Sequence, residues 1–263
     1  MSAIILDGAM VHYEALGRGR PIIFLHGWVG SWRYWINAMQ ATSTSFRAYA
    51  LDLFGFGDTS REPMHYSLDK QADLLNRFLE EMGIGKVAIV GHDLGALVGF
   101  SFLKRWHGSV ERMMVVNCPM EYEAITARMR TAPATELAEW LTSRNSESMA
   151  ALADASKVDP KAVAASLESL QADNLFPSVR NLGVPCLFVY GSNTPAVTLP
   201  SQERVDSLPM HMHQINLEGV GHFPMLDNPQ QFNRLLTDFL ALPPITNLSE
   251  ELQLKEEWKR RVR

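Results

Sequence analysis

Residues 91–95 carry an aspartate in a setting that suits a nucleophile. The stretch "VGHDLGALVG" places Gly91, Asp93 and Gly95 in the spacing G-x-D-x-G, between an apolar run and a helix-like run. Two glycines around a central residue permit a tight turn from a strand into a helix, which lifts the central side chain clear of the sheet. A carboxylate with an ordinary pKa of about 3.9 is ionised at neutral pH. Asp93 is therefore the candidate nucleophile, and it needs no base to attack.

A histidine late in the chain has the chemistry to work with Asp93. His222 lies in "GVGHFPMLDNP", after the last strand-like run. A carboxylate that attacks a saturated carbon bearing a leaving group forms an alkyl ester, and a histidine can then deprotonate the water that cleaves it. We expect His222 to take this role, with the backbone N–H groups of Trp28 and Leu94 forming an oxyanion hole. We expect His92 to point away from the nucleophile.

The runs before these residues predict the elements that position them. Buried strands are predicted at "PIIFLHG", "YALDLFG", "VAIVGHD", "RMMVVNC", "CLFVYGS" and "MHQINLEG", after a hairpin of "AIILDG" and "MVHYEAL". Helix-like segments lie between several of them, at 67–82, 94–106, 198–207 and 228–241. This alternation predicts an α/β protein with a doubly wound, mostly parallel sheet, whose ligands bind at the carboxyl ends of the strands.

The length of 263 residues fits one large domain with an insertion. Residues 119–182 have helical spacing and are too long for a single crossover, so we expect a small helical cap there, inserted before the last two strands. The core then consists of residues 1–118 and 183–242. Residues 243–263 are predicted to form a charged tail or helix.

Four motifs in this order resemble the α/β-hydrolase fold family, over about residues 1–241. They are the HG loop at 26–27, "DLFGFGDTS" at 52–60, the elbow at 91–95 and "GHFPMLDNP" at 221–229. The resemblance implies a hydrolase that needs no cofactor. Elbows with aspartate resemble those of haloalkane dehalogenases, haloacetate dehalogenases and epoxide hydrolases, and they imply a small, mostly apolar substrate with a carbon–halogen bond or an epoxide ring.

The third member of the catalytic triad is not at its usual place. Family members commonly have an aspartate after the "CLFVYG" strand, where this chain has Thr194. Some haloalkane dehalogenases take the acid from a Met-Glu pair after the preceding strand, and Met120 and Glu121 match that pair. Glu121 is therefore the candidate acid, with Glu123 or no acid at all as the alternatives.

The residues that would handle the leaving group also depart from the family. Epoxide hydrolases usually supply two cap tyrosines, whereas the predicted cap contains only Tyr122. Leu94 occupies the place of the halide-binding tryptophan of haloalkane dehalogenases, and residues 94–98 lack the arginines of haloacetate dehalogenases. The candidate substrate-binding side chains are aromatic: Trp28, Trp32, Tyr122, Trp140 and Phe223.

Three other functions stay open at this point. Asp93 and His222 can act as acid and base without a covalent intermediate, in a lyase, cyclase, isomerase or decarboxylase. A ligand-binding protein that has lost the chemistry fits the missing acid. Residue 93 can also replace the serine of an esterase-like parent.

Composition narrows the partners and the cellular setting. The net charge of −5 provides no basic surface for nucleic acid. No apolar run approaches the roughly 18 to 20 residues of a membrane span, so a cytoplasmic protein is expected. "GFGDTS" lacks the third glycine of a dinucleotide fingerprint, and the histidines show no metal-ligand spacing, so neither metal nor cofactor is expected. The expected partner is a small-molecule substrate, and the chain is expected to be a monomer or homodimer.

Overall fold

The computed structural model describes residues 2–142, 146–172, 177, 180–181, 183–243 and 247–252. Eight strands form one sheet in the order β1-β2-β4-β3-β5-β6-β7-β8. The strands are β1 (Ser2–Leu6), β2 (Ala9–Gly17), β3 (Arg20–Leu25), β4 (Phe46–Leu51), β5 (Val87–His92), β6 (Val110–Val116), β7 (Cys186–Gly191) and β8 (Met212–Leu217). β1 and β2 form a hairpin, β2 pairs antiparallel with β4, and all other pairs are parallel. The predicted fold class is confirmed.

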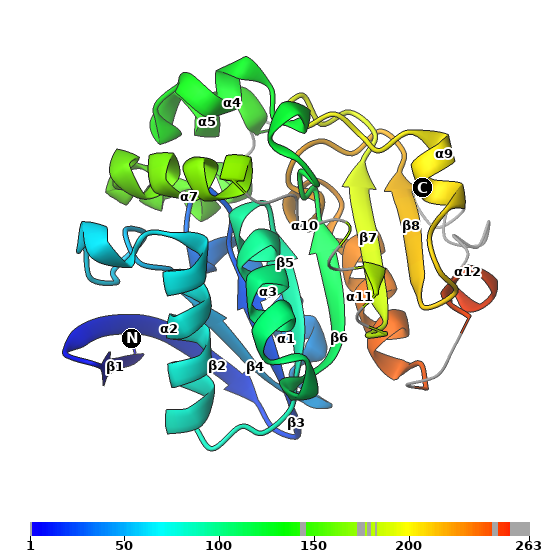
Figure 1. Ribbon diagram of the computed structural model, residues 1–263, viewed down its shortest axis with the longest axis horizontal. Helices are drawn as coiled ribbons and strands as arrows, with labels where there is room; N and C mark the ends of the chain where they lie inside the picture. The colour runs from blue at the N-terminus through cyan, green and yellow to red at the C-terminus, as the bar shows by residue number, and fades with distance from the viewer. Residues whose placement is uncertain are drawn as a thin grey trace.

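Helices cover both faces of the sheet and one of its ends. The described helices are α1 (Ile36–Thr42), α2 (Leu68–Glu81), α3 (Leu94–Arg105), α4 (Ala127–Thr131), α5 (Ala134–Leu141), α6 (Ser146–Ala151), α7 (Pro160–Ala172), α9 (Gln202–Asp206), α10 (Pro224–Asp227), α11 (Pro229–Ala241) and α12 (Leu248–Glu251), with 3₁₀ turns η1 (Trp32–Trp35), η2 (Pro63–His65), η3 (His107–Ser109), η4 (Tyr122–Ala124) and η5 (Ala153–Lys157). In Figure 1, α2 and α3 lie in front of the sheet and α1 and α11 lie behind it. The central strands are thus covered on both faces, which is why they appear as continuous apolar runs.

Helix α2 shows how local sequence sets an element that supports the site. The Ser67 hydroxyl accepts a hydrogen bond from the backbone N–H of Lys70 and caps the helix. Leu68, Leu75 and Phe78 recur at helical spacing and are buried against the core. The predicted helix at 67–82 is therefore confirmed to within a residue at each end.

The helix predicted at 198–207 is shorter in the structure. The backbone N–H of Thr198 bonds the carbonyl of Ala124 in the cap, so the chain is still extended at that point. Pro200 disfavours helical backbone at the residue before it. Ser201 then caps α9, which is limited to Gln202–Asp206. The contact with the cap and the proline therefore keep residues 198–200 out of the helix that the sequence pattern predicts.

The segment between β6 and β7 contains the turn η4, helices α4 to α6, the turn η5 and helix α7, as far as it is described. Figure 1 shows α4, α5 and α7 at the end of the sheet to which the parallel strands point. This is where the helical cap is expected, although the boundaries at 119 and 182 stay predictions. Of the expected C-terminal tail, residues 247–252, which include α12, are among the described residues, whereas residues 244–246 and 253–263 lie outside them.

A buried carboxylate ties the cap to the core. Asp154 is 5% exposed and accepts hydrogen bonds from the Ser31 hydroxyl at 2.8 Å and from Arg33 Nε at 2.7 Å. Lys157 bridges Asp154 and Asp58 at 3.0 Å and 2.8 Å. Burial opposes ionisation of Asp154, but the hydrogen bonds from Ser31, Lys157 and Arg33 outweigh it and lower its pKa. Charge on Asp154 therefore stabilises the contact between cap and core.

Two further hydrogen bonds join the cap to the core. Trp28 Nε1 donates to the Ser166 hydroxyl on α7 at 2.8 Å, with both side chains buried. The Tyr66 hydroxyl donates to Asp159 at 2.7 Å. Since Trp28 directly follows the HG loop, one of these contacts joins the cap to the predicted catalytic residues.

No helix in the described part of the chain has the length and apolar character that crossing a membrane requires.

We predict that Asp154→Asn destabilises the protein by about 1 to 3 kcal/mol at neutral pH, because Arg33 and Lys157 lose a buried charged partner. Urea unfolding measures the loss. The pKa of Asp154 is lowered on folding, so this contribution is present above pH 3.8 and disappears as the pH falls through the lower, folded value. Glu139→Gln, at an exposed position on α5, is the control and should have little effect. Equal stability of the Asp154→Asn variant and wild type would contradict the prediction.

Candidate active site

Asp93 lies on a strained turn between β5 and α3. Its backbone has φ 47° and ψ −116°, in a region that non-glycine residues rarely adopt. Gly95 permits this turn because a Cβ at that position would lie 2.3 Å from the Leu25 carbonyl oxygen. The backbone N–H of Asp93 bonds Val116 O at 3.1 Å, which joins the turn to the end of β6. The geometry matches the predicted nucleophile elbow, and strain of this kind is typical of functional sites.

The carboxylate of Asp93 and the imidazole of His222 meet in the interior. His222 Nε2 lies 2.7 Å from Asp93 Oδ2, and both residues are fully buried. Asp93 Oδ1 is also buried and has no hydrogen-bond partner within the described residues. Asp93 occupies the N-cap position of α3 without a side-chain capping hydrogen bond, and the positive end of the helix favours a negative charge there. An unpaired carboxylate oxygen in a buried site is free to react or to bind a ligand.

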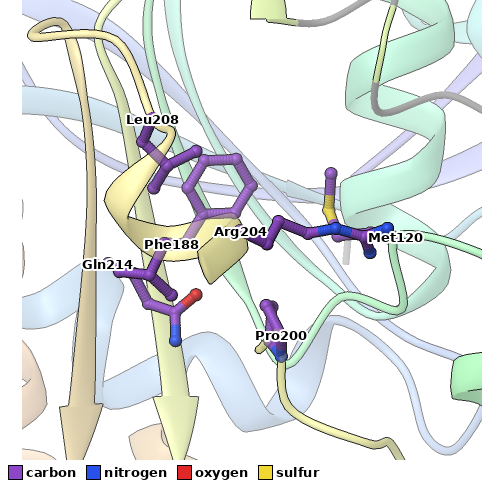
Figure 2. Close-up of a pocket in the computed structure, with 7 residues that line it drawn as sticks. Met120, Phe188, Pro200, Arg204, Leu208 and Gln214 are labelled. Atoms are coloured by element: carbon purple, nitrogen blue, oxygen red, sulfur yellow. The ribbon is translucent and has the colours of Figure 1, made fainter. Parts of the chain in front are cut away.

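The other nitrogen of His222 contacts a hydroxyl and not a carboxylate. His222 Nδ1 lies 3.0 Å from Thr194 Oγ1. Glu121 instead pairs with Arg204 on α9, with Nη1 to Oε1 at 3.2 Å. Figure 2 shows Arg204 extending toward Met120, the residue before Glu121. The expectation that Glu121 relocates to support His222 is corrected, because its charge is used by Arg204.

The loop after β3 lies directly against the nucleophile. A Cβ at Gly27 would lie 2.7 Å from Asp93 Cβ, so only glycine allows this approach. The next residue is Trp28, and Leu94 follows Asp93 as the first residue of α3. The two backbone N–H groups predicted to form the oxyanion hole therefore belong to the residues that directly follow Gly27 and Asp93. Their role in catalysis stays a prediction.

The HG loop owes its shape to a buried histidine. His26 Nε2 accepts a hydrogen bond from Leu53 N at 3.0 Å, and His26 Nδ1 lies 2.8 Å from Gly27 O. Because Nε2 is an acceptor, Nδ1 carries the proton and donates to Gly27 O. Burial lowers the pKa of His26, which favours this neutral form. The ring thus fixes the loop that approaches Asp93.

The five aromatic side chains proposed to bind substrate each have different neighbours in the structure. Phe223 is buried and packs against His222 with ring centroids 5.1 Å apart. The Trp32 ring contacts His12 and Arg33, and the Tyr122 and Trp140 rings lie under Arg130 and Arg128. Trp28 uses its indole N–H on Ser166, so this group is not available to a halide. Substrate contact by these side chains stays a prediction, and within the described contacts only Phe223 touches His222.

Trp28 also lines a cavity of about 370 Å³ in the cap. Most of its lining is apolar, from α5, η5 and α7, and it includes Leu137, Val158 and Val163. Neither Asp93 nor His222 lines it. Its size and apolar character fit a small-molecule site, and Trp28 connects it to the loop that lies against Asp93.

His92 contacts the backbone of His222 and the side chain of Tyr34, a role that the sequence did not indicate. Its Nε2 lies 2.9 Å from the His222 carbonyl oxygen, and its Nδ1 lies 3.1 Å from the Tyr34 hydroxyl. Tyr34 also accepts a hydrogen bond from Gly27 N. The expectation that His92 points away from Asp93 is wrong, since His92 Nε2 is only 3.8 Å from Asp93 Oδ2. Adjacency to the nucleophile was the only available signal, and it does not indicate direction.

The only cluster that brings histidine nitrogens to Asp93 consists, among described residues, of His92, Asp93 and His222. Their ligand atoms lie within 4.8 Å of one another. However, His92 Nε2 is bonded to the His222 carbonyl and His222 Nε2 to Asp93. Both nitrogens are already hydrogen-bonded to oxygen atoms, so the geometry favours an acid–base pair over a metal site.

Comparisons with known proteins identify the family and the fold of the chain. The family model described as "Alpha/beta hydrolase family" matches residues 22–235, and the chain belongs to that family. It is 32% identical over 113 residues to a soluble epoxide hydrolase of Corynebacterium sp. (strain C12), over 43% of this chain and 40% of that protein. Epoxide hydrolase 4 of Homo sapiens is 32% identical over 118 residues, 43% of this chain and 32% of that protein. The chain thus matches less than half the length of either relative.

Among solved structures, the enol-lactonase from Burkholderia xenovorans LB400 has a TM-score of 0.76 and 21% identity. The match covers 92% of this chain and 100% of that chain. At this identity the likeness establishes the fold alone. The predicted resemblance to the α/β-hydrolase family is confirmed, and the relatives named here are hydrolytic enzymes.

We predict that His92 makes the protein less stable in mild acid. Burial lowers its pKa to about 4, so below pH 6.5 the unfolded chain binds a proton that the folded site excludes. The His92 contribution to the free energy of unfolding should fall by about 1.4 kcal/mol per pH unit between pH 6.5 and pH 4. Urea unfolding of wild type and His92→Gln across this range measures it, because the variant lacks this proton uptake. His107→Gln, at an exposed position, is the control. Parallel pH profiles of wild type and His92→Gln would show that His92 titrates normally.

Proposed function

We propose that the protein is a hydrolase in which Asp93 is the covalent nucleophile and His222 activates water. The observation that carries this proposal is the state of the Asp93 carboxylate. It lies on a strained elbow at the start of α3, with Oδ2 bonded to His222 and Oδ1 buried and unpaired. The presence of epoxide hydrolases among the relatives supports the same chemistry.

In the first step Oδ1 attacks a saturated carbon. A new C–O bond forms, the leaving group departs with the bonding electrons, and the enzyme becomes an alkyl ester at Asp93. No base is needed for this step, because a carboxylate attacks through an oxygen that carries no proton. The hydrogen bond from His222 to Oδ2 holds the carboxylate so that Oδ1 stays available.

In the second step water attacks the ester carbonyl carbon. His222 Nε2 takes a proton from the water, and the negative charge forms on an oxygen beside the N–H groups of Trp28 and Leu94. Collapse of this intermediate releases the alcohol and restores the carboxylate, with one oxygen now derived from water. This step needs Nε2 as a proton acceptor, so the Nε2 proton that binds Oδ2 in the resting site must first pass to the leaving group or to solvent, and the proton that His222 keeps lies on Nδ1, facing Thr194.

The substrate expected here is small and mostly apolar, with an epoxide ring or a carbon–halogen bond. The cap cavity next to Trp28 supports the apolar character. The names of the relatives favour the epoxide. The tyrosine pair usual in epoxide hydrolases is not matched, because the cap has only Tyr122 and its ring lies 4.8 Å from Arg130.

A second candidate function is acid–base catalysis by Asp93 and His222 without a covalent ester. The observation that favours it is the Thr194 hydroxyl at His222 Nδ1. A neutral hydroxyl stabilises an imidazolium less than a carboxylate does, which weakens the water-activating step. A proton-transfer reaction needs only the contact between Asp93 and His222.

We predict that turnover in H₂¹⁸O labels the carboxylate of Asp93. Attack of water on the alkyl ester leaves one water-derived oxygen in the side chain, and multiple turnovers accumulate it. Peptide mass spectrometry after incubation with a panel of epoxides, haloalkanes and haloacids measures the label. The peptide with the buried Asp52 is the internal control and should stay unlabelled. Asp93→Asn should reduce turnover by at least about 1,000-fold.

Product formation without label in the Asp93 peptide would reject the covalent cycle and favour acid–base catalysis. Full activity of Asp93→Asn would reject both candidate functions. Esterase activity of Asp93→Ser would show that the rest of the elbow suits a serine nucleophile.

We predict that filling the cap cavity weakens substrate binding. Val163 lines the cavity from α7, so Val163→Trp should raise KM about tenfold for the productive substrate while changing kcat less. Steady-state kinetics measure both constants. Glu168→Trp, at an exposed position on the same helix that does not line this cavity, is the matched control. An unchanged KM for Val163→Trp would place the substrate elsewhere.

A further inference from the structure

Asn117 occupies a costly backbone conformation at the end of β6. Its φ is 45°, in the left-handed region, and the residue is fully buried. Asparagine tolerates this region better than most residues do. β6 lies between β5, which leads to Asp93, and β7, which leads to Thr194. Asn117 is therefore placed among the loops that form the site.

The amide of Asn117 bonds the backbone of two of these loops. Its Oδ1 accepts from Gly191 N at 2.9 Å, where the chain leaves β7 toward Thr194. Its Nδ2 donates to the carbonyl of His222 at 2.7 Å and lies 3.4 Å from that of Gly221. One side chain thus holds the loop that carries Thr194 and the loop that carries His222.

The two loops are also packed tightly against each other. A Cβ at Gly191 would lie 2.0 Å from Gly221 O, so the loops approach as closely as glycine permits. The His222 carbonyl accepts a second hydrogen bond, from His92 Nε2 at 2.9 Å. Both acceptor positions of this carbonyl are therefore filled, by Asn117 and His92, and the backbone of His222 is held in place.

We propose that Asn117 is the positioning residue for His222, in place of the orientation that a triad carboxylate provides. The inference rests on the proposed role of His222 as the base. In a complete triad a carboxylate fixes the imidazole through Nδ1. Here Nδ1 meets the Thr194 hydroxyl, so the direction of the ring depends on the backbone that carries it. Asn117 fixes that backbone and, through Gly191, the start of the loop to Thr194.

The residue type suits this task. An amide offers one acceptor for Gly191 N and two donors for the carbonyls of Gly221 and His222. Aspartate at the same position would keep the acceptor but would face those carbonyls with a negative charge. Glycine would adopt the backbone conformation freely but would lose all three contacts. Substitution by aspartate therefore removes the amide donors and keeps the backbone strain, whereas substitution by glycine removes both the side-chain contacts and the strain.

The test compares Asn117→Asp and Asn117→Gly with wild type, and Asn216→Asp is the control. Asn216 is an exposed asparagine on β8, before the loop that carries His222, so the control makes the same chemical change close by. The first readout is the ¹⁵N and N–H signals of the His222 imidazole in the resting protein, assigned by their loss in His222→Gln. The second is the pH profile of kcat and KM.

We expect both Asn117 variants to shift the His222 ring signals and to lower kcat about 10- to 100-fold, with little change in KM. The pH profile of kcat should move, because the contact between His222 and Asp93 changes. Asn216→Asp should leave every readout as in wild type. If Asn117→Asp does not fold, Asn117→Gly gives the result, since its backbone is unstrained.

Unchanged His222 ring signals, with only a lower Tm, would overturn the proposal and reduce Asn117 to a structural role. The ring signals are measured without substrate, so they test the positioning role even if the proposed function fails. The failure of the proposed function is recognised separately, by full activity of His222→Gln.

Discussion

The hydrogen bond between Asp93 Oδ2 and His222 Nε2 is the interaction on which the rest of the site depends. It joins groups 129 positions apart in the chain, and both side chains are fully buried. A bond to a carboxylate in such surroundings is strong only if its partners are held in register. The strained turn before α3 holds one partner, and the carbonyl contacts of His92 and Asn117 hold the other. The tight glycine contacts follow from the same requirement.

The fold and the contact between Asp93 and His222 were predictable because both depend on local patterns. The G-x-D-x-G turn, the buried runs before it and the late histidine are short-range signals, and each indicates a strand end. Side-chain partners across the site were not predictable. Glu121 matched a motif, but its charge is taken by Arg204, which lies 83 positions away. Asn117 carried no signal, because its role depends on where two other loops run.

The substitution of Thr194 for an acid changes the balance of the two chemical steps. In the proposed covalent cycle, attack by Asp93 needs no help from Thr194, whereas water activation relies on the orientation and basicity of His222. That cycle is thus better supported at its first step than at its second. In a covalent mechanism this imbalance leads to a long-lived ester, while a proton-transfer mechanism is unaffected by it.

Trp28 connects the HG loop to the cap, since its backbone follows that loop and its indole N–H bonds Ser166 on α7. Movement of α7 away from the core would break this bond and remove one of the contacts that hold the loop beside Asp93. Evolution of a new cap for a new substrate is therefore constrained at this point. A replacement helix must offer a hydrogen-bond acceptor where Ser166 does, or the loop loses an anchor.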